Sequence, residues 1–179
     1  MNGIQASSVA VIVNRTHRSA DSVLAEFASH LRRQGWQVRG VVQDNVVFDN
    51  NCGRQMVLID VSDGSRFPIS QNLGTGSASC CVDPGGVVAA SVALRRGLTE
   101  GADLVIANRF GELEAGGGGF AAEMLALMAE GIPLLTVVNE RYLEDWRRFS
   151  GNAAQELEPQ REALDAWFAD LVRQKRLTR

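Results

Sequence analysis

Residues 103–124 read DLVIANRFGELEAGGGGFAAEM and point to the fold class of this chain. An apolar run at 104–107 ends at Asn108 and Arg109, and four consecutive glycines at 116–119 precede a helical pattern that starts at Phe120. A short apolar run of this kind is typical of a strand buried on both faces. The stretch therefore predicts a strand, a loop and a helix N-terminus, which is where α/β proteins hold anions and cofactors.

The same alternation continues outward in both directions. Apolar runs predict strands at 9–13, 37–42 and 134–138, and helical spacing predicts helices at 19–34, 83–101, 120–131, 142–149 and 159–176. Short β runs with turn signals at 45–70 predict an inserted hairpin or meander. We interpret the apolar stripe of the last helix as core packing. The pattern favours an α/β fold, a mostly parallel sheet flanked by helices, in a single domain over residues 1–179.

Composition excludes several function classes. A net charge of −3 gives no basic field to attract nucleic acid. No apolar stretch approaches the length of a membrane span and no signal peptide is recognisable, so we expect no membrane insertion and a cytoplasmic location. The three cysteines lack metal or disulfide spacing, and no metal site is predicted. Cys80 and Cys81 are interpreted as small buried side chains, with redox or soft-metal chemistry as the alternative.

Three of the predicted strands end in the same chemistry, an asparagine followed by an arginine either directly or after one intervening residue. Because the carboxyl ends of parallel strands share one edge of a sheet, these side chains are expected to gather and to suit a phosphate, a nucleotide or a tetrahedral oxyanion. The alternative is that polar residues simply follow strands and that arginine, 17 of the 18 basic residues, is almost the only cation available. The candidate ligand-binding residues are Asn14, Arg15, His17, Arg18, Asn108, Arg109, Gly111, Gly116, Gly117, Gly118, Asn139 and Arg141.

Glu114 is the catalytic candidate. It lies between the strand end and the glycines, where a carboxylate could act as a general base or hold a metal-bound water. The alternative is an acidic side chain that favours a helix N-terminus, and Glu112 is the weaker of the two candidates. The glycines allow the backbone to approach a ligand closely, or they form a mobile lid.

The chain resembles an uncharacterised bacterial family of unknown function that is often encoded beside molybdate-uptake transporter genes. The resemblance covers nearly the whole chain, and it is most specific in ANRFGELEAG at 107–116 and GIPLLTVV at 131–138. It also includes GVVQ at 40–43, LID at 58–60 and CVDPG at 81–85. The resemblance implies a role in molybdate or molybdenum-cofactor metabolism.

That family is in turn similar to the THEP-type nucleoside triphosphatases, which have a RecA-like P-loop fold. Their acidic loop reads roughly Asp-Glu-x-Gly-x-x-Glu and handles magnesium and water. Here Asn108 and Arg109 stand at the acidic pair, while Gly111 and Glu114 match the later positions. The phosphate loop is degenerate, because residues 14–21 read NRTHRSAD where GxxxxGK[ST] is required. The only lysine is Lys175, so no other lysine replaces the missing one.

Three hypotheses follow. The first is a binding protein whose ligand is a small anion, either molybdate or another oxyanion, or a nucleotide with magnesium. The second is a divergent magnesium-dependent nucleotide phosphohydrolase that uses Glu114, and the third is a regulatory or scaffold protein with a vestigial site. The sequence leaves open the identity of the ligand, whether turnover occurs, and whether the chain forms a homo-oligomer.

Overall fold

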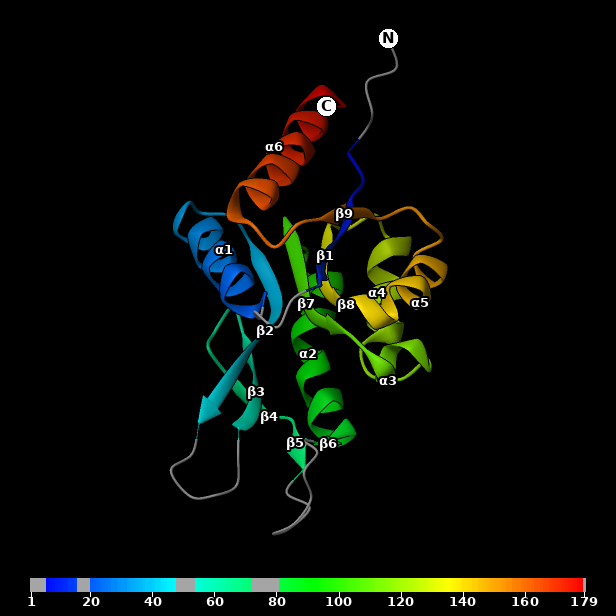
Figure 1. Cartoon of the computed structure of the whole chain (residues 1–179). Coiled ribbons are helices and arrows are strands. Elements are labelled where there is room, and N and C mark those ends of the chain that lie inside the picture. The colour runs from blue at the N-terminus through cyan, green and yellow to red at the C-terminus, as the bar shows by residue number, and fades with distance from the viewer. Residues whose placement is uncertain (1–5, 16–19, 48–53, 72–80, 179) are drawn as a thin grey trace.

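A computed structural model describes residues 6–15, 20–47, 54–71 and 81–178 of the chain. Their central feature is a seven-stranded sheet in the order β4-β3-β2-β7-β8-β1-β9 (Figure 1). Strands β2, β7, β8, β1 and β9 are mutually parallel, and β3 and β4 extend the sheet beyond β2 as an antiparallel meander. The expected mostly parallel sheet with an inserted meander is confirmed.

The strands and helices alternate along the chain. The sheet consists of β1 (Val9–Asn14), β2 (Val38–Val47), β3 (Arg54–Asp60), β4 (Arg66–Pro68), β7 (Leu104–Phe110), β8 (Leu134–Asn139) and β9 (Gln155–Leu157), and β5 (Ser70–Gln71) pairs with β6 (Cys81–Val82) in a separate hairpin. The helices are α1 (Asp21–Arg33), α2 (Pro84–Glu100), α3 (Glu112–Ala115), α4 (Ala121–Ala129), α5 (Leu143–Phe149) and α6 (Arg161–Leu177), with a 3₁₀ turn η1 (Glu140–Tyr142) before α5.

Several features of the chain differ from expectation. A helical turn, α3, begins at Glu112 where a loop was expected. Two further differences concern strands. The strand expected at 104–107 continues as β7 to Phe110, and its pairing with β8 shifts register between Ala107 and Phe110. This β-bulge places Asn108 and Arg109 within the strand and not after it. The second difference is β9, a short edge strand beside β1 that the sequence did not predict, because its residues lack an apolar alternation.

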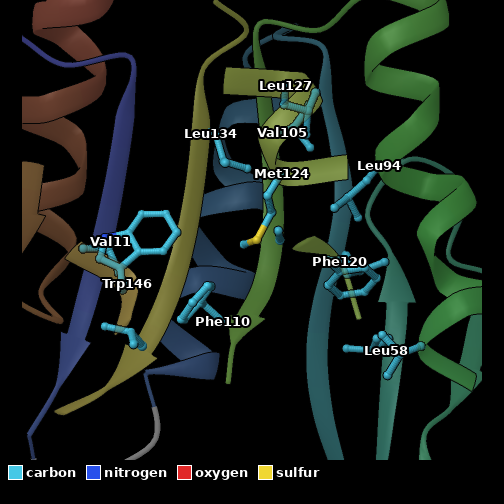
Figure 2. Packing of buried hydrophobic residues seen from close by; sticks show 14 of the residues in the cluster. Val11, Leu58, Leu94, Val105, Phe110, Phe120, Met124, Leu127, Leu134 and Trp146 are labelled. Atoms are coloured by element: carbon cyan, nitrogen blue, oxygen red, sulfur yellow. The ribbon is translucent and has the colours of Figure 1, made fainter. Parts of the chain in front are cut away.

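Helices cover both faces of the sheet. Figure 1 shows α1 and α6 together on one side, where Phe168 of α6 packs edge-on against Phe27 and Trp36 with ring centroids 6.3 and 5.2 Å apart. The predicted core role of the α6 stripe is therefore confirmed. On the opposite face, helices α2, α4 and α5 pack on the sheet in one cluster, which includes Leu94 of α2 and Met124 of α4 (Figure 2). In the same cluster Phe110 of β7 and Trp146 of α5 have ring centroids 5.3 Å apart. No helix among the described residues is both long and apolar enough to cross a membrane.

Candidate functional site

The carboxyl ends of β1, β8 and β7 lie side by side at one edge of the sheet. Asn14 and Asn139 are paired residues at the ends of β1 and β8, and Val138 is opposite Phe110 of β7. Across this edge Arg15 donates to Glu140 at 2.8 Å, an exposed ion pair that joins the segments after β1 and β8. The structure thus brings together the ends of the three strands that the sequence singled out.

A buried polar cluster lies at the end of β7. Asn108 Nδ2 donates to Asp21 Oδ1 at 3.0 Å, and Arg109 donates through one terminal nitrogen to both carboxylate oxygens of Asp21, at 3.3 and 3.2 Å. Asn108 and Asp21 are 1% and 5% exposed, whereas the Arg109 side chain is 38% exposed. The peptide bond between Asn108 and Arg109 is cis. This cluster connects β7 to the first residue of α1.

Two atoms of this cluster have unused hydrogen-bonding capacity. Among the described residues, three buried side-chain polar atoms have no hydrogen-bond partner, and two of them are Asn108 Oδ1 and Arg109 Nε. The third, Trp146 Nε1, belongs to α5. Buried polar groups are nearly always paired, so unpaired ones call for a physical explanation. Two of the three unpaired atoms therefore belong to adjacent residues at one strand end, an acceptor on Asn108 and a donor on Arg109.

Asp21 is the member of the cluster that sequence reasoning missed. It is the last residue of the segment 14–21 that the sequence comparison set against the motif GxxxxGK[ST], at the position where that motif has serine or threonine. The sequence did offer a signal, since an acidic residue at that position is unusual for the motif. In the structure Asp21 is the first residue of α1 and is buried. Its partners are 87 and 88 residues away in the sequence, so only the fold reveals the pairing.

Glu114 organises the loop that follows β7. Its Oε2 accepts the N–H of Gly111 at 3.0 Å and its Oε1 accepts the N–H of Phe120 at 3.1 Å, so both carboxylate oxygens are engaged with the backbone. The side chain is 6% exposed. Burial raises the pKa of Glu114, and the N–H donors of Phe120 and Gly111 partly oppose that rise. Glu114 thereby fixes the start of α3 at Gly111 and the end of the glycine segment at Phe120.

The glycine segment closes on itself. The N–H groups of Gly116, Gly117 and Gly118 donate to the carbonyls of Glu112, Glu114 and Leu113, at 3.1, 3.0 and 2.7 Å. These three amides therefore already have partners within the loop. Contact between this segment and a ligand remains a prediction.

The other candidate residues are placed as follows. Asn139 Oδ1 accepts the N–H of Arg141 at 3.1 Å and thereby caps η1. The guanidinium of Arg141 lies over the ring of Tyr142, 4.9 Å from its centroid. His17 and Arg18 lie outside the described residues. Cys80 and Cys81 are at positions whose side chains the structure does not describe. In the described part of the chain no group of three His, Cys, Asp or Glu side chains could hold a metal ion.

Comparison with known proteins finds relatives over most of the chain. The model of the family described as "Protein of unknown function (DUF2478)" matches residues 9–167. A molybdenum import ATP-binding protein, ModC 2 of Bradyrhizobium diazoefficiens, is 36% identical over 167 residues, which are 93% of this chain and 19% of that protein. The chain therefore spans only about a fifth of that relative's length.

A solved structure shares the fold. The solution structure of a human cancer-related nucleoside triphosphatase superposes with a TM-score of 0.64, covering 96% of this chain and 98% of that one, at 16% sequence identity. The expected P-loop-NTPase-like fold is thereby confirmed. At this identity the likeness concerns the fold alone.

Proposed function

This chain belongs to the DUF2478 family, and from that premise we propose that it is an anion-binding domain whose ligand is a tetrahedral oxyanion held at the carboxyl ends of β1, β7 and β8. The observation that carries the proposal is the cluster of buried Asp21 and Asn108 with the half-buried Arg109, whose Nε–H is unpaired. Ligands of open α/β sheets bind outside this edge. A guanidinium fixed by a carboxylate is oriented in advance, and its remaining N–H groups suit an oxyanion.

Molybdate is the leading ligand of this class. Support comes from the relative named as a molybdenum import ATP-binding protein, which contains a segment similar to nearly all of this chain. Since that segment is 19% of the relative, we propose that the domain serves molybdenum import as a part distinct from the rest of such a protein. In this role the domain holds or senses the oxyanion.

Calorimetric titration tests the proposal. Molybdate, tungstate, sulfate, phosphate, ATP and GTP are titrated separately into the wild-type protein and into Arg109→Gln. Hydrogen bonds to charged groups contribute roughly 1.5–3 kcal/mol, so oxyanion affinity is expected to fall about 10- to 100-fold in the variant.

The matched control is Arg173→Gln, which removes an arginine from α6, where the side chain is 71% exposed and paired with Asp170. Its affinity should equal that of the wild type. Absence of oxyanion binding, or binding that Arg109→Gln leaves unchanged, contradicts the proposed function. Blank titrations together with a captured protein partner would instead favour the scaffold hypothesis.

Nucleotide binding with hydrolysis is the second candidate, and the fold shared with a nucleoside triphosphatase favours it. Against hydrolysis, the Glu114 side chain is only 6% exposed, and each of its carboxylate oxygens accepts a backbone N–H, which weakens it as a base. We expect no phosphate release from ATP or GTP in the presence of magnesium. Release that Glu114→Gln abolishes, in a variant shown to be folded, would support the hydrolase instead.

A further inference from the structure

Proteins of this fold that act on nucleotides hold magnesium between two elements. One ligand is the serine or threonine that ends the phosphate loop, and the other is an acidic residue at the end of a neighbouring strand. Counting GxxxxGK[ST] along residues 14–21 puts Ala20 at the lysine position and Asp21 at the hydroxyl position. The acidic pair of the strand is replaced by Asn108 and Arg109.

The residues at these positions bond directly to one another. Arg109 Nη2 is 3.2 and 3.3 Å from the two oxygens of Asp21, and Asn108 donates to the same carboxylate at 3.0 Å. Relative to the magnesium-binding arrangement, the acidic charge has moved from the strand to the helix start, and a cation has taken its place on the strand. The chain thus supplies its own positive charge between the two elements.

These residues do not fit a hard divalent cation. Magnesium needs several oxygen ligands in near-octahedral geometry, and the cluster offers one carboxylate that is already neutralised by Arg109. A guanidinium is a permanent charge with five N–H donors, so it repels a metal ion and attracts an anion at every physiological pH. The missing lysine at position 20 removes the other usual contact to a triphosphate.

We propose that the Arg109 guanidinium, held by Asp21, takes the place of the divalent cation in this site, so that the domain binds a free oxyanion without magnesium and not a magnesium–nucleotide complex. The choice of ligand rests on the proposed function. The exclusion of the metal rests on the ion pair alone. The two parts are therefore tested separately.

The first arm measures anion affinity with and without metal. Molybdate, sulfate and phosphate are titrated into the wild-type protein in about 1 mM EDTA and again in about 5 mM magnesium. The EDTA removes divalent metal ions from the protein, and the magnesium saturates any ordinary magnesium site. The affinity is expected to agree within about twofold. Binding that requires magnesium overturns the inference and leaves the proposed function standing. Binding of no anion under either condition overturns the proposed function, and the second arm then decides the metal question.

The second arm needs no anion. Manganese(II), a paramagnetic substitute for magnesium, is titrated into the wild type, Arg109→Asp and the matched charge control Arg173→Asp, and free metal is followed by electron paramagnetic resonance. Arg109→Asp restores an acidic strand residue beside Asp21, so it is expected to bind manganese at least about tenfold more tightly than the other two proteins.

The outcomes of the second arm are distinct. Wild-type binding of manganese that Asp21→Asn abolishes overturns the inference, as does a folded Arg109→Asp variant with no gain over Arg173→Asp. Should Arg109→Asp fail to fold, as judged by circular dichroism, the wild-type titration and its Asp21→Asn comparison decide the result alone.

Discussion

Two buried carboxylates hold the end of β7 by different kinds of bond. Asp21 accepts from side chains, the amide of Asn108 and the guanidinium of Arg109, and so joins α1 to the sheet. Glu114 accepts from two backbone N–H groups and so shapes the following loop. Only the first arrangement leaves a donor unused, at Arg109 Nε. This difference is why we assign the anion to Arg109 and a structural task to Glu114.

Glu114→Gln tests that structural task. Glutamine keeps one acceptor oxygen, but its NH₂ group would face the N–H of either Gly111 or Phe120 and leave a buried donor unpaired. We expect the free energy of unfolding to fall by about 1–3 kcal/mol, measured by urea denaturation. The neighbouring Glu112→Gln, at an exposed position, should change it by less than about 0.5 kcal/mol. Equal stability of the two variants would show that the Glu114 hydrogen bonds contribute nothing.

The same residue should make stability depend on pH. Burial raises the pKa of Glu114 above its ordinary value of 4.5. A carboxyl whose pKa is higher in the folded state contributes most below its unfolded pKa, and the contribution is lost as pH rises through the folded pKa. The stability difference, wild type minus Glu114→Gln, should therefore shrink from pH 4.5 upward, because subtracting the variant isolates the contribution of Glu114. Urea denaturation across this range measures it, and a difference that grows with pH contradicts the raised pKa.

Sequence alone singled out part of the polar cluster at the end of β7. Asn108 and Arg109 stood out because they end an apolar run, which is a local signal. Asp21 did not stand out, because its importance comes from a contact between α1 and β7 that depends on tertiary structure. The roles of Asn139 and Arg141 were also not visible, since each engages its own turn. Local patterns locate residue types at strand ends, and the fold decides their partners.

At the scale of elements, the segment between β7 and α4 shows why its glycines differ. Gly117 and Gly119 both have positive φ angles, +87° and +54°. A residue that carries a side chain adopts such angles only at a cost in free energy. A Cβ on Gly117 would meet nothing within 4 Å, whereas one on Gly119 would lie 2.1 Å from Glu114 Oε1. That oxygen is fixed by its bond to Phe120 and cannot move aside freely. Gly117 is therefore required for its backbone conformation alone, whereas Gly119 is required both for its conformation and for the space that Glu114 occupies.

The pair Gly117→Ala and Gly119→Ala separates the two effects. Gly117→Ala should lower the free energy of unfolding by about 1–2 kcal/mol, the cost of the backbone conformation. Gly119→Ala should cost about 1–3 kcal/mol more, because the new methyl group overlaps the Glu114 carboxylate. Urea denaturation of both variants measures the difference. Equal losses would mean that Glu114 yields without cost and that only φ matters at both positions.

The elements were predictable to different degrees. The start of α2 was clear, because Asp83 and Pro84 form a capping pair, and Asp83 Oδ1 indeed accepts the N–H of Gly85 at 2.9 Å. The apolar parallel strands were equally clear, because burial on both faces leaves an unbroken apolar run. The bulge of β7 and the edge strand β9 were not, since both arise from pairing with neighbours and leave no periodicity in the sequence.

At the scale of the whole molecule, the sheet divides the core into two clusters. Val11 and Leu94 belong to the cluster under α2, α4 and α5, while Leu24 and Leu164 belong to the cluster under α1 and α6. The strands contribute alternate residues to the two faces, so each cluster is built on the same backbone. We expect the two clusters to unfold together as a single domain.

Three leucine-to-alanine variants test this cooperativity. Leu94 in α2 and Leu164 in α6 are both 0% exposed but lie on opposite faces, and Leu177, also in α6, is 81% exposed. Removing either buried side chain should lower the free energy of unfolding by about 2–5 kcal/mol, because it deletes apolar contacts and leaves a cavity. Leu177→Ala should change it by less than about 0.5 kcal/mol. All three variants should keep the m-value of the wild type in one transition. In a single cooperative unit, the loss of a contact on either face destabilises every element equally. A second transition that Leu164→Ala shifts and Leu94→Ala does not would therefore show that α6 and its face of the sheet unfold separately from the rest.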